Sequence, residues 1–217
     1  MITDLAGLRT DVDARFSSLG PRHWPPPRRK GEGPRDEEYS RCLDPGKYVI
    51  ASQRASAWSD ALEAAELAAV KRMGTRELGP WGAVETTSIT ARRPGTEPVF
   101  LHTSSEQLPG LIVAYGSPEV VLTSHPPCGC DACDHGSAEV IQGIDEALES
   151  IVLGEVVIER NRSSGRIVTR NWQTSSRRPR SDPRWMIGRW NGAPWFPEPS
   201  PEEDAPSPMG DAPHPAN

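Results

Sequence analysis

Apolar residues recur at helical spacing in two long segments of the chain. The first begins at Asp44-Pro45, a capping residue type followed by a proline suited to the first helical position, and runs to Met73-Gly74. The second follows Asp134 and Ser137, either of which can cap it, and ends at Gly154. The pattern predicts two amphipathic helices, the second with a face toward water made of Glu139, Gln142, Asp145, Glu146 and Glu149.

Between and after these segments, apolar and β-branched residues alternate over short runs. VETTSITARRPGTEPVFLHTS holds two runs separated by Pro94-Gly95, and LIVAYGSPEVVLTS holds two more around Gly116-Ser117-Pro118. EVVIERNRSSGRIVTRNW predicts a hairpin that turns at Ser164-Gly165. Loops this short join antiparallel strands, because parallel neighbours need a longer crossover. The expected fold class is α+β, with a single antiparallel sheet of about six strands and two packed helices.

Proline-rich polar stretches flank this region on both sides. They bury too little apolar surface to offset the entropy of ordering a chain, so both are predicted to be disordered. The expected organisation is a short N-terminal helix with a Pro-rich linker at 1–38, one α+β domain at 39–174, and an Arg/Trp-rich segment with an acidic Pro-rich tail at 175–217.

The 217-residue sequence contains no apolar run approaching the ~20 residues that a membrane span needs, and its start lacks the apolar core of a signal peptide. We therefore expect a cytoplasmic protein with no membrane partner. Thiols stay reduced in that compartment, so clustered cysteines favour metal binding or redox chemistry over structural disulfides.

Three of the four cysteines fall in the segment HPPCGCDACDHG at 125–136. Cys128, Cys130 and Cys133 form C-x-C-x-x-C, and the small residues between them let a tight loop turn its sulfurs toward one point. A structural zinc ion takes four tetrahedral ligands, so these thiols leave one ligand to be found. The candidates for it are His125, His135, Asp131, Asp134 and Cys42.

Three interpretations of this loop compete. In the first, it binds zinc through Cys128, Cys130 and Cys133 with His125 or His135, and the metal pins the second helix to the sheet. In the second, Cys130 and Cys133 serve a thiol-redox or metal-dependent enzyme, because a C-x-x-C at a helix entry lowers a thiol pKa. In the third, the aspartates shape a turn and the thiols pack as small apolar groups.

Three segments of the chain resemble an actinobacterial family of uncharacterised domain proteins: EEYSRCLDPGKYVIASQRASAWSDAL, ARRPGTEPVFLHTS and PPCGCDACDHGSAEVIQGIDEALESIVLGEVV. Members carry a D-C-G-C-D-A-C-D-x-G-S segment ahead of an acidic helix. The resemblance covers residues 36–172 and implies a family without implying a function. This chain has Pro127 where an aspartate is common, and Cys42 where similar chains carry an aliphatic residue, which argues against Cys42 as an obligatory ligand.

Two further features concern partners. The formal net charge is −6, yet a block of nine arginines stands between acidic flanks, so nucleic-acid binding through Arg160–Arg189 is one alternative and a solvated, internally paired face is the other. The aromatic segment WMIGRWNGAPWF at 185–196 either docks on its own domain or folds onto an unidentified protein partner. The arginines are Arg160, Arg162, Arg166, Arg170, Arg177, Arg178, Arg180, Arg184 and Arg189.

Catalytic motifs are absent from the sequence. It contains no G-x-S-x-G, P-loop, Rossmann or H-E-x-x-H pattern, and the strand residue His102 is expected to be a satisfied polar neighbour rather than a catalytic base. The sequence therefore favours a non-enzymatic domain with a structural zinc site and a protein-interaction role.

Overall fold

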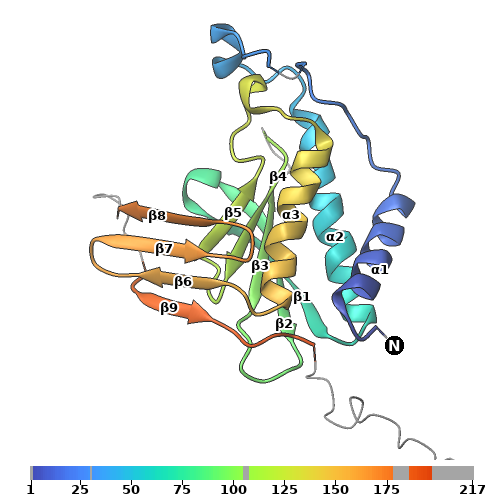
Figure 1. Ribbon diagram of the computed structural model, residues 1–217, viewed down its shortest axis with the longest axis vertical. Coiled ribbons are helices and arrows are strands. Elements are labelled where there is room, and N and C mark those ends of the chain that lie inside the picture. The colour runs from blue at the N-terminus through green and yellow to red at the C-terminus, as the bar shows by residue number, and fades with distance from the viewer. Residues whose placement is uncertain (1, 30, 105–107, 178–185, 197–217) are drawn as a thin grey trace, which may run out of the picture.

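The computed structural model describes residues 2–29, 31–104, 108–177 and 186–196. Within them the fold is α+β, with three α-helices and two antiparallel sheets (Figure 1). The helices are α1 (Leu5–Ser18), α2 (Val49–Ala64) and α3 (Ser137–Val152); α2 and α3 pack on one face of the larger sheet, and α1 packs against α2. Short 3₁₀ turns are η1 (Asp36–Ser40), η2 (Pro45–Tyr48), η3 (Gly79–Trp81) and η4 (Asp131–Cys133).

The larger sheet has five strands in the order β1-β2-β3-β4-β5, each antiparallel to its neighbour. This order confirms the antiparallel prediction for the central region, where four of these strands were expected. The strands are β1 (Ala68–Glu77), β2 (Ala83–Ala91), β3 (Val99–Ser104), β4 (Gly110–Tyr115) and β5 (Val121–His125).

The prediction of one sheet of about six strands is wrong, because the C-terminal strands form a second sheet. Helix α3 separates β5 from the predicted hairpin, and that hairpin pairs with two further short strands in the order β8-β7-β6-β9. The two added strands are polar or glycine-containing and show no alternation that a sequence pattern could reveal. The four are β6 (Val157–Arg160), β7 (Ser164–Val168), β8 (Gln173–Arg177) and β9 (Gly188–Asn191).

Helix α2 is shorter than the expected helix, which was to end at Met73-Gly74. Glu66 has a positive φ of 57°, and the Leu67 N–H donates to the Leu62 carbonyl at 3.1 Å, an arrangement of the Schellman type that ends the helix. The chain then enters β1, which pairs with β2 along its whole length. Cross-strand pairing thus overrides the helical propensity of this alanine-rich stretch.

The N-terminal Pro-rich segment, expected to be disordered, is ordered against the loop that precedes α3. The Trp24 backbone bonds to Ser137 in both directions, its N–H donating to Oγ at 3.2 Å and its carbonyl accepting from the Ser137 N–H at 3.1 Å. A Cβ on Gly136 would lie 2.8 Å from the Pro26 nitrogen, so only glycine admits this contact. Hydrogen bonds from Trp24 and Arg28 hold this segment, whose composition offers few apolar residues to bury. The acidic tail at 197–217 lies outside the described residues.

The aromatic segment docks on its own domain over its described part, residues 186–196. Trp195 is buried and its N–H donates to the Val152 carbonyl at the end of α3, at 2.8 Å. Trp190 of β9 lies so close to Gly116 that a Cβ there would be 2.1 Å from the indole. The second sheet is thereby joined to the main core, into which Ile158 is fully buried.

The arginine block is partly described, since Arg178, Arg180, Arg184 and the neighbouring Trp185 fall outside the described residues. Arg189 of β9 pairs with Glu159 of β6 at 3.3 Å, and Arg170 pairs with Glu155 at 3.8 Å.

Across the whole described part of the chain, no helix combines the length and the apolar character needed to cross a membrane.

Candidate metal centre

The cysteine-rich loop connects β5 to α3 and lies beside the connection from α1 to α2 (Figure 1). Cys128 follows two prolines at the end of β5. Cys130 precedes the turn η4 and Cys133 ends it, with the Cys133 N–H donating to the Cys130 carbonyl at 3.1 Å. A single tight turn therefore sets the separation of the last two thiols.

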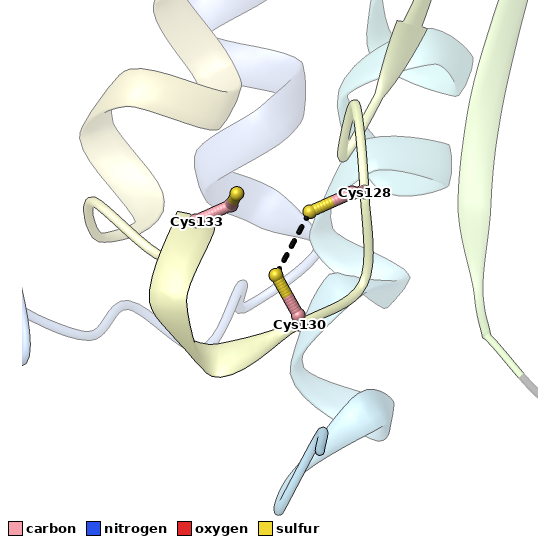
Figure 2. Close-up of side chains that lie close together, drawn as sticks. All are labelled: Cys128, Cys130 and Cys133. Atoms are coloured by element: carbon pink, nitrogen blue, oxygen red, sulfur yellow. Dashed lines mark hydrogen bonds between the residues drawn. The ribbon is translucent and has the colours of Figure 1, made fainter. Parts of the chain in front are cut away.

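The three thiols of this loop converge. Their Sγ atoms all lie within 4.8 Å of one another, and those of Cys128 and Cys130 are 3.1 Å apart. Figure 2 shows the three sulfurs turned toward a shared space. All three cysteines are free and reach solvent, so an ion or small molecule has access to them.

The aspartates of the loop are used for structure. Both oxygens of Asp134 are occupied, Oδ1 accepting from the Trp24 indole and the Gly136 N–H, each at 2.9 Å, and Oδ2 accepting from Lys47 Nζ at 2.6 Å. Burial would raise the pKa of this carboxyl, but the Lys47 and Trp24 donors outweigh it, and the net effect lowers the pKa.

Asp131 holds the chain that leads to α2. Its Oδ1 accepts from the Leu43 N–H at 3.1 Å, its Oδ2 accepts from Arg41 Nε at 3.3 Å, and its own N–H donates to the Arg41 carbonyl at 2.8 Å. Cys42 is thereby held near the loop, although its sulfur is not in the three-thiol group. Burial and the charge of Asp131 raise the pKa of the Cys42 thiol.

Arg28 joins the Pro-rich segment to the turn η4. Its Nη2 donates to the Ala132 carbonyl at 2.6 Å and the Asp134 carbonyl at 3.2 Å, while Nη1 donates to the Asp131 carbonyl at 3.1 Å and to Glu38 at 3.0 Å. Satisfying three carbonyls with one guanidinium fixes the path of the loop. No local pattern points to Trp24, Arg28 or Lys47, because their partners lie roughly ninety to more than a hundred positions away in the chain.

The predicted histidine ligands lie outside the thiol group. Among the described residues, no imidazole or carboxylate atom joins the three sulfurs within 4.8 Å. His125 ends β5 with its ring against Gly143 of α3, where a Cβ would be 2.5 Å from Cε1, and its Nε2 lies 3.3 Å from Thr123 Oγ1. Burial lowers the pKa of His125 to about 4, so the ring is neutral at pH 7. His135 is exposed.

The short distances between the three sulfurs shift the ionisation of Cys130 and Cys133. The hydrogen bond between Cys128 and Cys130 lowers the pKa of the Cys130 thiol, whereas the contacts with Cys128 and Cys130 raise the pKa of Cys133 to about 12. Three thiolates this close would repel one another, and a cation among them would offset that repulsion.

A cleft adjoins the thiol group between β5 and the first half of α3. Its volume is about 640 Å³, and its walls include Cys133, His125, His135, Glu139 and Glu146. A second cavity of about 380 Å³ lies on the Cys128 side and is lined by Trp81, Leu108, Leu111 and Ile112. The segment His125–Pro127 lines both cavities. Cys133 lies in the wall of the first cavity and Cys128 in the wall of the second.

His102, the other histidine considered from the sequence, is fully buried on β3. Its Nδ1 lies 2.9 Å from Thr86 Oγ1 and its Nε2 lies 3.0 Å from the Pro118 carbonyl, so both ring nitrogens have partners. The prediction of a satisfied polar residue is confirmed.

The relationship to known proteins rests on one match. Residues 12–207 match a family described as a family of unknown function (DUF6226). The chain belongs to this family. The match spans α2, the cysteine-rich loop and both sheets, so the thiol group lies within the region that defines membership. No curated protein and no solved structure matches the chain.

Proposed function

We propose that Cys128, Cys130 and Cys133 bind one zinc ion as thiolates, and that this metal fixes the loop between β5 and α3. The observation that carries the proposal is the convergence of three sulfur atoms within 4.8 Å of one another on a loop of six residues. Zn²⁺ supplies the positive charge that allows three neighbouring thiols to ionise.

The sulfur spacing suits this ion. Zn–S bonds of about 2.3 Å in a tetrahedron place ligand sulfurs roughly 3.8 Å apart. The shortest sulfur pair in the group is 3.1 Å apart and every pair is within 4.8 Å, so small side-chain rotations reach the required spacing. An iron–sulfur cluster fits less well, because it usually takes four cysteines.

The surrounding contacts support a preorganised site. Arg28, Asp131 and Asp134 hold the turn η4 through hydrogen bonds that do not involve sulfur. Binding therefore orders three side chains rather than a whole loop, which lowers the entropic cost of capturing the ion. In this proposal the three thiolates bind the metal, and the sequence-predicted ligands His125 and His135 belong to the wall of the adjoining cleft.

The test is metal analysis of the purified full chain, with three variants. We expect one zinc per native chain and per Cys42→Ser chain, because Cys42 stands outside the group, and we expect loss of zinc in Cys130→Ser. His135→Ala should keep its metal. Circular dichroism of each variant shows whether the fold is intact. A native chain without stoichiometric zinc, purified without chelator, rules the proposal out.

Thiol-redox chemistry is the second candidate, and the 3.1 Å contact between the Cys128 and Cys130 sulfurs favours it. Oxidation of this pair would form one S–S bond while two protons and two electrons pass to a peroxide oxidant. Reversible loss of both thiols at equimolar peroxide, with Cys42 still free, supports this function. Unchanged thiol counts under the same conditions reject it.

A further inference from the structure

We propose that the metal bound by the three cysteines keeps its fourth coordination position for the thiolate of a small aminothiol, held in the cleft between the loop and α3. This inference rests on the proposed function and adds the class of ligand. The positively charged amino group of that ligand lies near the carboxylates of Glu139 and Glu146.

The fourth position is the first step of the argument. Zinc sites with three protein ligands bind an external group in the remaining position. Within the part of the chain that the structure describes, the carboxylates of Asp131 and Asp134 are hydrogen-bonded elsewhere, and no imidazole lies within the sulfur group. The remaining ligand is therefore expected to come from outside this loop.

The cleft gives that external group its place. Cys133 belongs both to the sulfur group and to the cleft wall, so a molecule in the cleft lies against a residue that supplies one of the metal-binding sulfurs. The volume of about 640 Å³ falls in the range of small-molecule sites, which span roughly 300–1,000 Å³.

The charge of the cleft selects a cation. Its walls carry Asp134, Glu139 and Glu146 and, over the described part of the chain, contain neither lysine nor arginine. Lys47 neutralises Asp134 at 2.6 Å, which leaves the two glutamates of α3 to act on a ligand. Glu146 also accepts a hydrogen bond from Gln142 at 2.8 Å, and both residues line the cleft.

The donor atom follows from the metal environment. An ion already bound by soft thiolates accepts a further thiolate readily. In the exchange, the ligand thiol would give its proton to solvent, its sulfur would bond to the metal, and a water molecule in the fourth position would leave. A cationic group and a soft sulfur together define an aminothiol.

The cavity on the Cys128 side predicts a different ligand. Among the residues that the structure describes, its walls hold Trp81, Leu108, Leu111 and Ile112 and include no carboxylate, so it would favour a neutral thiol. The two cavities therefore make opposite predictions about ligand charge, which a single series of thiols separates.

The experiment uses the full chain loaded with Co²⁺, whose sulfur-to-metal absorption reports each bound thiolate. Cysteamine, 2-mercaptoethanol and mercaptoacetate are titrated into it, and gel filtration then confirms that the cobalt stays with the chain. We expect the absorption to rise on saturation with cysteamine, with cysteamine binding on the order of tenfold more tightly than 2-mercaptoethanol and mercaptoacetate binding most weakly.

The double variant Glu139→Gln/Glu146→Gln should reduce the preference for cysteamine to about twofold or less and leave 2-mercaptoethanol affinity unchanged. Glu63→Gln on α2, which lines neither cavity, is the matched control and should keep the full preference.

The outcomes separate the two proposals. Stoichiometric cobalt with a spectrum that no thiol changes overturns the inference and leaves the metal site standing. Equal or tighter binding of 2-mercaptoethanol or mercaptoacetate overturns it as well, and so does removal of the cobalt by cysteamine. A chain that binds neither zinc nor cobalt overturns the proposed function and this inference together.

Discussion

The guanidinium of Arg54 forms a bidentate ion pair with the carboxylate of Asp145 in the interior between α2 and α3. Arg54 Nε donates to Oδ1 at 2.8 Å and Nη2 donates to Oδ2 at 3.0 Å, and the Trp58 indole donates to Oδ1 at 2.7 Å. Arg9 of α1 reaches Oδ2 at 2.7 Å. One buried carboxylate thus ties three helices together, at a position that the sequence pattern had assigned to the water face of α3.

Removing that carboxylate should cost far more than removing an exposed one. Asp145→Ala removes the buried carboxylate that pairs with Arg54 and leaves it only the more exposed Asp13, at 2.6 Å from Nη2, so we expect the free energy of unfolding in urea to fall by about 3–5 kcal/mol. The control is Asp11→Ala, which breaks the partly exposed pair with Arg15 on α1 and should cost about 0–1 kcal/mol. Losses of similar size in the two variants would contradict this account.

Gly143 is expected to be intolerant of alanine because of His125. A Cβ there would lie 2.5 Å from the imidazole, so Gly143→Ala must displace the ring and should lower stability by about 1–3 kcal/mol despite the better helix propensity of alanine. Gly7→Ala on α1, whose nearest atom is a side-chain oxygen at 3.3 Å, is the comparison. Equal losses of thermal stability in the two variants would show that the His125 ring can move aside without cost.

Arg28 should control the order of the cysteine-rich loop. Arg28→Gln removes the charged donors to the Asp131, Ala132 and Asp134 carbonyls, and we expect faster hydrogen exchange over residues 131–137 with a loss of about 1.5–3 kcal/mol. Arg29→Gln changes the adjacent arginine and should leave exchange in the loop as it is. Unchanged protection in Arg28→Gln would mean that the loop is held by Asp131 and Asp134 alone.

Acid should weaken the fold through His102. Burial lowers the pKa of this histidine, which faces Arg76 and Glu119, below the ordinary value near 6.5. Below pH 6.5, His102 binds a proton in the unfolded chain but stays neutral in the folded chain. The free energy of unfolding therefore falls as pH drops toward the lowered pKa, by at most about 1.4 kcal/mol per pH unit.

His102→Gln should flatten that dependence between pH 7 and pH 5. A residual slope is expected from His125, whose pKa of about 4 acts in the same direction. Phe100→Leu removes the ring stacked on His102 without changing a titrating group, so it should lower stability while keeping the native slope. Denaturation curves measured across this range decide the matter, and identical slopes in His102→Gln and the native chain would refute the assignment.

The local pattern of this sequence determines its fold class and the parts of its candidate site. Alternation and short turns specify the antiparallel strands from β2 to β5, and helical spacing specifies α3. The spacing of Cys128, Cys130 and Cys133 makes one tight turn sufficient to bring their sulfurs together. These features depend on residues close in the chain, and so they can be seen without a structure.

Only the tertiary structure decides which distant residues complete these elements. The division into two sheets, the end of α2 at Ala64, the burial of Asp145 and the order of the Pro-rich segment all depend on partners that no local pattern encodes. The same holds for the cleft beside Cys133, whose walls come from β5, α3 and η2. Composition alone predicts that a charged residue or a Pro-rich segment lies on the surface. Such a residue or segment can pack into the fold when hydrogen bonds within the protein replace those that its polar groups made to water.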